Sequence, residues 1–127
     1  MLKKAVILFI LACVFISVAP CYLAAEEPGG IGLAILQLYH HDRKDRKGPI
    51  VVIDVMPSGP ALVAGVERGD IITHIDNQLV AGNDFFYILE EMLRGPAHSN
   101  ITLTIQRAST NQNFNLSLER VKTKGLY

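Results

Sequence analysis

Cysteine is scarce in this sequence, and its position is more informative than its number. The chain has two cysteines, Cys13 and Cys21, and both fall within the first 25 residues. The rest of the chain has no cysteine, so no disulfide can form within it. A fold built from those remaining residues must therefore depend on apolar packing and hydrogen bonds alone.

Charge is missing from residues 5–25, which follow the basic residues Lys3 and Lys4 and end at Glu26. A short basic start, an uncharged apolar run and small residues before a polar boundary are typical of a secretory signal peptide. The run is also long enough, at about 20 residues per span, to serve as a retained anchor. We therefore expect export, with residues 1–25 acting as a signal peptide or an N-terminal membrane anchor.

Three fates of this leader stay open from the sequence. The triplet Leu23-Ala24-Ala25 is an acceptable cleavage site, although leucine at its first position is imperfect. A lipoprotein signal would modify Cys21, but the proline directly before it fits that signal poorly. The third fate is retention of the whole leader. We expect an exported protein that is periplasmic or extracellular, or else anchored to the inner membrane.

A basic surface is also lacking. The chain has 12 Lys and Arg residues against 12 Asp and Glu residues, and removal of Lys3 and Lys4 with the leader leaves a net charge of −2. Such a balance gives no basic face for nucleic acid. The sequence also lacks internal repeats and low-complexity tracts. We expect one domain over residues 28–122, followed by a C-terminal tail at residues 123–127.

Turn-forming residues divide this domain into short strand-like segments and two helical ones. Pro60 suits the first turn of a short helix, and Gly65 suits the left-handed position that ends it. Apolar spacing predicts a longer helix from a cap at Asn83 or Asp84 to Arg94. Strands are expected at residues 33–39, 50–55, 71–75, 79–80, 101–106 and 114–118. This order predicts a small α+β fold with a partly open antiparallel barrel.

Three blocks of sequence, taken in order, resemble a PDZ domain. They are Gly30-Ile31-Gly32-Leu33-Ala34-Ile35; then Ser58-Gly59-Pro60-Ala61 with Ala64-Gly65-Val66 and Gly69-Asp70-Ile71-Ile72; then Leu93-Arg94-Gly95-Pro96 with Ile101-Thr102-Leu103-Thr104-Ile105 and Arg107. They look most like the PDZ domains of bacterial carboxyl-terminal-processing and related envelope serine proteases. One departure is Asn77, where the family usually has glycine, and the turn chemistry tolerates it.

The resemblance implies a PDZ-like, partly open antiparallel β-barrel or sandwich of five to six strands, with one short and one long helix. It also implies a peptide-binding groove. Glycines on both sides of Ile31 allow successive backbone N–H groups to point into one anion-binding concavity. The strand that follows would offer an open edge to which a peptide adds, a mode for which PDZ domains are a standard example. We expect Gly32→Pro to abolish binding without unfolding the domain.

The groove would be lined on one side by the loop and strand and on the other by the long helix. Two helix registers are open: one with Phe85, Leu89 and Met92, the other with Phe86, Glu90 and Leu93. The first register is wholly apolar and is favoured, so the last ligand side chain should be apolar. The predicted peptide-binding residues are Gly30, Ile31, Gly32, Leu33, Ala34, Ile35, Phe85, Leu89 and Met92.

No catalytic or metal-binding pattern is found beside this groove. The serines outside the leader lack a G-x-S-x-G elbow, and the neighbours His40, His41 and Asp42 lack a spaced partner pair. We expect no cofactor, no metal and no enzymatic activity. The predicted function is a non-catalytic module that captures protein C-termini or extended peptides, with an envelope protease as a further partner and membrane contact only through the N-terminal segment. The alternative is a membrane-anchored docking subunit of an envelope assembly or protease complex whose groove is unused.

Overall fold

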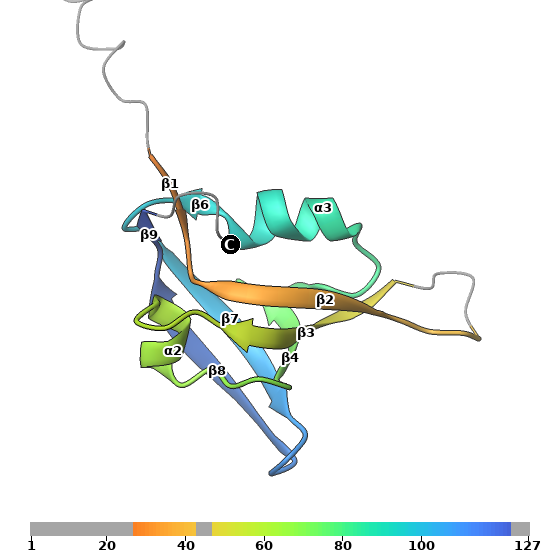
Figure 1. Cartoon of the computed structure of the whole chain (residues 1–127). Helices are drawn as coiled ribbons and strands as arrows, with labels where there is room; N and C mark the ends of the chain where they lie inside the picture. The colour runs from red at the N-terminus through yellow and green to blue at the C-terminus, as the bar shows by residue number, and fades with distance from the viewer. Residues whose placement is uncertain (1–26, 43–46, 123–127) are drawn as a thin grey trace, which may run out of the picture.

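The computed structural model describes residues 27–42 and 47–122 (Figure 1). The predicted leader and the tail at residues 123–127 lie outside the described residues. In chain order the elements are β1 (Pro28–Gly30), β2 (Leu33–Tyr39), β3 (Lys47–Val55), α2 (Pro60–Ala64), β4 (Ile71–Ile75), β5 (Gln78–Leu79), α3 (Phe85–Tyr87), the π-helix η2 (Ile88–Leu93), β6 (Gly95–Pro96), β7 (Asn100–Arg107), β8 (Gln112–Glu119) and β9 (Val121–Lys122). Among these described elements, no helix has the length and apolar character needed to cross a membrane.

The strands form two antiparallel sheets. The larger sheet has six strands in the order β2-β3-β4-β7-β8, with β5 paired to β4 at the side, and the smaller one has the order β6-β1-β9. Within the described residues β2 and β8 do not pair with each other, so the large sheet is open. The predicted α+β fold with five to six antiparallel strands and a partly open barrel is confirmed.

The core contains aliphatic side chains from the large sheet, from both helical segments and from the loop before β2. Strand β7 shows why: Ile101, Leu103 and Ile105 are fully buried, while the threonines between them are only half-buried. Alternate residues of a strand point to opposite faces, so this pattern sets one face of β7 against the core. The same cluster includes side chains from β2, β3, β4 and the helical segment. Packing of the core thus fixes where the helical segment lies relative to β2.

The turns follow the backbone chemistry of their residues. Gly59 caps α2, Pro60 is its first residue and Gly65 ends it with a left-handed φ of 96°, as expected from the sequence. Asp76 and Asn77 both have positive φ, at 50° and 63°, and together form the tight β4–β5 connection. Two consecutive left-handed residues match the twist of a two-residue hairpin. Asn77 therefore fills the position where glycine is usual.

The predicted longer helix is found and consists of two parts. Only Phe85–Tyr87 is α-helical, and Ile88–Leu93 continues as a π-helix, in which Arg94 N–H donates to the carbonyl of Leu89 over 3.0 Å. Asp84 is the N-cap residue, but its side chain makes no capping hydrogen bond. Over so few turns the spacing of apolar residues does not separate an α-helix from a π-helix. The position and the last residues of the predicted longer helix are as expected, whereas its division into an α-helical and a π-helical part was not predicted.

The small sheet was also not predicted. Its strands have two or three residues each, too few for the alternation of side chains to be visible in the sequence. A Cβ added at Gly29 would lie 2.7 Å from Cα of Ala97, so only glycine permits β1 to approach the chain after β6 so closely. This sheet holds β1 directly before the predicted anion-binding loop.

Candidate functional site

The predicted ligand strand, β2, lies at one end of the large sheet. It pairs with β3 on one side and, in the described part of the chain, with no strand on the other. Figure 1 shows the α3–η2 segment on the side of β2 opposite to β3. The pairing with β3 shifts register twice along the strand, between Ala34 and Ile35 and between Gln37 and Tyr39. The arrangement leaves one row of β2 backbone groups available beside the helical segment.

The loop between β1 and β2 is held by its carbonyl groups. The carbonyl of Ile31 accepts a hydrogen bond from Ala61 N–H at 3.0 Å, and that of Gly32 accepts one from Met56 N–H at 2.9 Å. In a trans peptide the carbonyl and the next N–H point in opposite directions. The N–H groups of Gly32 and Leu33 therefore point away from α2 and from the end of β3. The φ of 79° at Gly32 is what makes this turn accessible.

The predicted site residues differ widely in exposure. Ala34 is exposed, Ile35 and Phe85 are half-buried, and the other six predicted residues are buried, namely Gly30, Ile31, Gly32, Leu33, Leu89 and Met92. Leu89 and Met92 belong to the hydrophobic core, as do Ile31 and Leu33. In the other helix register, Phe86 and Glu90 are exposed and Leu93 is fully buried. Burial therefore does not choose between the two registers, and the peptide-binding residues stay a prediction.

A pocket of about 210 Å³ opens beside the start of β2. Its lining consists of Gly32, Leu33 and Ala34 from the loop and β2, together with Asp54, Val55, Met56 and Pro57 from the end of β3 and the residues after it. The structure thus brings three of the predicted site residues together in one pocket. Phe85, Leu89 and Met92 do not line it.

The positive φ of Gly32 corrects one expectation. Proline fixes φ near −65°, so Gly32→Pro would force the loop into another conformation and would damage the fold as well as the site. A Cβ at this position would lie 3.1 Å from Cβ of Met56, which is shorter than an ordinary contact and would require Met56 to shift by a few tenths of an ångström. Alanine is therefore the more informative substitution.

Gln37 is a buried polar residue that the sequence analysis did not single out. Its Nε2 donates to the carbonyl of Gly48 at 3.2 Å and to the carbonyl of Asn83 at 2.9 Å. These bonds tie β2 to β3 and to the loop before α3, at the end of β2 far from the glycine loop. A single glutamine in the otherwise apolar run LAILQLY was the available signal, because a buried polar side chain needs partners.

Arg120 joins the opposite end of the helical segment to the sheets, and it was also missed. Only 6% of its surface is exposed. Its guanidinium donates to the carbonyls of Leu93 at 2.9 Å, Met92 at 3.2 Å and Asn100 at 3.2 Å, and to Oγ of Ser99 at 3.0 Å. Burial lowers the pKa of Arg120 from its usual value, with the charge of Asp76 acting in the other direction. Nothing in the sequence marks this arginine, because its partners are backbone carbonyls.

Asp70 and Arg107 belong to the sequence blocks that resemble a PDZ domain. They form an ion pair near the C-terminal end of α2. Arg107 donates from Nε to Oδ1 of Asp70 at 2.9 Å and from Nη2 to Oδ2 at 2.8 Å, and Glu67 N–H donates to Oδ2 at 2.9 Å. Burial would raise the pKa of Asp70, but these hydrogen bonds and the charge of Arg107 outweigh burial and hold the pKa below its usual value. The hydrogen bond to Asp70 raises the pKa of Arg107. Arg107 also donates to the carbonyl of Gly65 at 2.8 Å, so the ion pair links β7 to the end of α2 and to the turn before β4.

Two of the described histidines, His74 and His98, have local partners. Nδ1 of His74 lies 3.0 Å from Oγ1 of Thr73, and Nδ1 of His98 lies 3.2 Å from Oε1 of Glu119. No group of three histidine, cysteine or acidic side chains able to hold a metal ion occurs within residues 27–42 and 47–122. The geometry of the described residues therefore points to the glycine loop and the edge of β2 as the candidate site.

Comparison with known proteins gives consistent matches. A carboxy-terminal-processing protease of Bartonella bacilliformis is 30% identical over 102 residues, which cover 79% of this chain and 21% of the protease. A probable periplasmic serine endoprotease, DegP-like, of Pseudomonas fluorescens is 30% identical over 79 residues, 61% of this chain and 16% of the relative. The chain thus spans about a fifth or less of the curated relatives it matches.

A solved structure shows the same fold. The PDZ domain of a carboxy-terminal protease from Vibrio cholerae, in complex with a peptide, is 19% identical with a TM-score of 0.59, covering 76% of this chain and 96% of that domain. The model of the PDZ domain family matches residues 30–118, which include all three sequence blocks that carried the resemblance. The resemblance is confirmed, and this chain belongs to the PDZ domain family.

Proposed function

We propose that residues 28–122 bind protein C-termini or extended peptides by strand addition to the edge of β2 that pairs with no strand among the described residues. The terminal carboxylate would accept hydrogen bonds from the N–H groups of Gly32 and Leu33. The observation that carries the proposal is the bonding of the glycine loop, because the bonds to Ala61 and Met56 direct both N–H groups to the side away from α2 and β3. The edge of β2 continues directly from this loop.

The expected affinity is modest. Each main-chain hydrogen bond contributes a net ~0.5–1.5 kcal/mol, and ordering an extended peptide offsets part of the total. Selectivity among peptides then depends on the side chains that contact the last residue of the ligand. The apolar residues Leu33 and Ile35, which follow the loop directly along β2, favour an apolar last residue.

We further propose that the domain is exported to the cell envelope and performs no chemistry of its own. Both matched relatives carry protease names, one of them periplasmic, and the alignment covers only a small part of each. The matched part is the PDZ region, a binding module. The partners proposed are protein C-termini and, as a further candidate, an envelope protease.

One observation favours a second candidate function. Leu89 and Met92, which were expected to line the groove, are packed into the core. Burial of these side chains leaves little of their apolar surface for a ligand, which fits a docking subunit of an envelope assembly or protease complex, held at the membrane by its N-terminal segment. This candidate predicts binding through another face and no preference for a free carboxylate.

A C-terminal peptide library tests the two candidates against each other. The full-length chain, kept in non-ionic detergent because residues 5–25 are uncharged and apolar, would be screened against peptides that end in a free carboxylate. Enrichment of apolar last residues is expected, with at least about tenfold weaker binding of the same peptides as C-terminal amides, because about 1.4 kcal/mol is tenfold in affinity. Equal binding of acid and amide would reject the carboxylate site and favour the docking candidate.

Matched glycine variants separate an effect on the loop from an effect on stability. Gly32 and Gly69 both have positive φ, at 79° and 90°, so alanine strains the backbone at either position by about 1–2 kcal/mol. Near Gly69 no described atom would lie within 4 Å of the new Cβ, whereas at Gly32 the new Cβ meets Met56. Both variants should unfold at lower temperature, but only Gly32→Ala should weaken peptide binding. Equal affinities for the two variants would count against the loop.

A further inference from the structure

The large sheet ends at β8, and the outer edge of this strand pairs with no other strand in the described part of the chain. β8 pairs with β7 in unbroken register over its whole length, from Gln112 to Glu119. It contains no proline, no glycine and no basic residue, and its one charge is on its last residue. Exposed edges in proteins usually carry charges, prolines or bulges that prevent pairing with another chain. None of these protections is present along residues 112–118.

The two faces of β8 differ sharply in polarity. Asn113, Asn115 and Ser117 are exposed on one face. On the other face Phe114, Leu116 and Leu118 pack against the core, but Phe114 and Leu116 are only half-buried. These three apolar side chains are therefore covered by the core, but Phe114 and Leu116 remain partly exposed to solvent.

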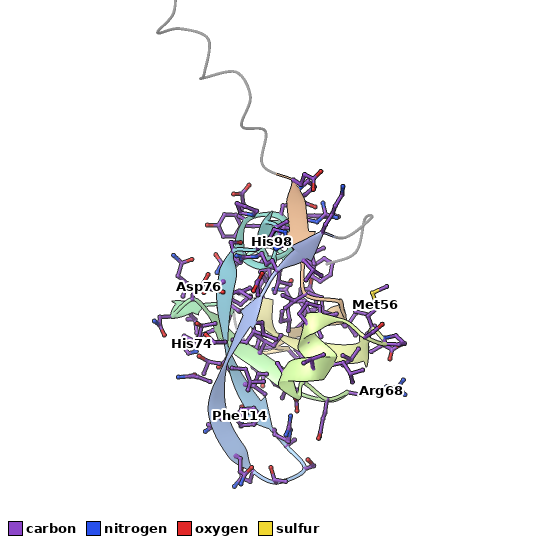
Figure 2. The ribbon with its side chains drawn as sticks, turned by 90° about the vertical axis from the view of Figure 1, so that its left-hand side faces the viewer. Met56, Arg68, His74, Asp76, His98 and Phe114 are labelled. Carbon is purple, nitrogen blue, oxygen red and sulfur yellow. The ribbon has the colours of Figure 1, made fainter. Side chains whose placement is uncertain are left out.

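An apolar groove borders the second half of this edge. It has a volume of about 500 Å³ and is lined by residues of β8, β9, α2 and the chain before α2, among them Val63, Ser117, Leu118 and Glu119. Val63 is 83% exposed, which is unusual for an aliphatic side chain. In Figure 2 α2 lies beside the upper part of β8, and Phe114 lies further along the strand, toward the tip of the β7–β8 hairpin.

We propose that β8 pairs in antiparallel orientation with β8 of a second copy of this chain, about a twofold axis at Leu116. In this register Phe114 of each copy lies opposite Leu118 of the other, next to the groove beside Val63. Asn115 lies opposite Ser117, and Asn113 lies opposite Glu119, whose carboxylate can accept from the amide. Apolar positions thus meet apolar ones and polar positions meet polar ones. A shift of one residue would oppose Asn115 to Leu116 and break this match along the strand.

The alternation of apolar and polar residues in β8 thus matches itself across the twofold axis, and for this reason we take a second copy of the chain as the partner of this edge. The interface is small, with one strand pair bordered by two symmetric grooves, so the dimer should dissociate on dilution. β2 is at the other end of the sheet. The dimer would leave both β2 edges open and so would present two peptide sites to one multivalent target, which raises the apparent affinity without new contacts.

Disulfide trapping tests the pairing directly. The full-length chain with Cys13→Ser and Cys21→Ser would carry Leu116→Cys or, as a control, Ile53→Cys, an exposed aliphatic residue on the interior strand β3. Residues that face each other across an antiparallel pair have Cα atoms about 4.5–5.5 Å apart, within disulfide range. Mild oxidation should give a covalent dimer for Leu116→Cys and monomer for Ile53→Cys. Monomer for both, or a dimer for Ile53→Cys alone, would overturn the proposal.

A second variant, Asn115→Lys, tests the same dimer without the Leu116→Cys substitution, which could itself disturb the packing of β8. Asn115→Lys keeps the exposed face polar and brings two like charges close together across the axis, while Ile53→Lys adds the same charge away from it. Sedimentation in detergent should show that Asn115→Lys weakens dimer formation at least about tenfold and that Ile53→Lys leaves it unchanged. A dimer equally stable in both variants would place the contact elsewhere and overturn the proposal, as would a wild-type chain that stays monomeric at about 0.5 mM.

Discussion

Replacement of Arg120 by methionine is the perturbation for which the structure predicts the largest effect outside the apolar core. Methionine keeps an unbranched apolar stem of similar reach but removes every donor. Three backbone carbonyls, those of Met92, Leu93 and Asn100, then lose their partner while Arg120 is only 6% exposed. The hydroxyl of Ser99 also loses a donor. The variant therefore tests whether one arginine holds the end of the π-helix against the sheets.

The magnitude follows from two opposing effects. A buried carbonyl left without a partner costs about 1–3 kcal/mol, so the two buried ones, of Met92 and Leu93, would cost about 2–6 kcal/mol, and the partly buried one of Asn100 adds less than either. Removing the guanidinium also removes the cost of keeping a charge out of water, which offsets several kcal/mol. A net loss of about 2–4 kcal/mol is expected. For a domain of this size that corresponds to a fall in Tm of about 8–30 °C.

Urea unfolding followed by far-UV circular dichroism measures the effect, since the chain has no tryptophan. The slope of free energy against urea should be the same in wild type and variant, so that the midpoints report stability. Lys122→Met is the control, because Lys122 is largely exposed and makes an exposed ion pair with Glu27 at 3.0 Å. It should change stability by less than about 0.5 kcal/mol. A loss below about 1 kcal/mol for Arg120→Met would refute the assigned role of the arginine.

Two further predictions concern the other buried polar groups. The pKa of Asp70 is lowered in the folded state, so its contribution to stability is present above its unfolded pKa of about 3.9 and is lost as pH falls through the folded pKa. Urea titrations from about pH 7 to pH 2 should show that part of the acid destabilisation disappears in Asp70→Asn, and parallel pH curves would contradict the ion-pair assignment. Gln37→Ala should lower the free energy of unfolding by about 1–3 kcal/mol, because the carbonyls of Gly48 and Asn83 lose their donor. Tyr39→Phe, which removes only a 3.5 Å contact to Gln37, is the matched control and should be nearly neutral in the same measurement.

Local chemistry made several elements predictable from the sequence alone. Pro60 and Gly65 marked α2 because proline suits a first helical residue and glycine tolerates the left-handed position after the last one. Residues 33–39 and 71–75 were predicted as strands, and the structure has β2 and β4 with the same bounds. Three sequence blocks in order also indicated the family, and the family model matches residues 30–118. In each case a few residues that are close together in the sequence were enough to predict the element or the family.

Tertiary structure alone decided which polar groups hold the site in place. Arg120 bonds to carbonyls of residues 20 to 28 positions away, and Gln37 bonds to a carbonyl 46 positions away. Backbone carbonyls occur at every residue, so no sequence pattern marks them as partners. The same holds for the two open ends of the sheet, because strand order depends on long-range pairing. The sequence determined the glycine loop and the strand after it. Only the folded chain decided that, among the described residues, β2 pairs on one side alone and that the N–H groups of Gly32 and Leu33 point away from α2 and from the end of β3.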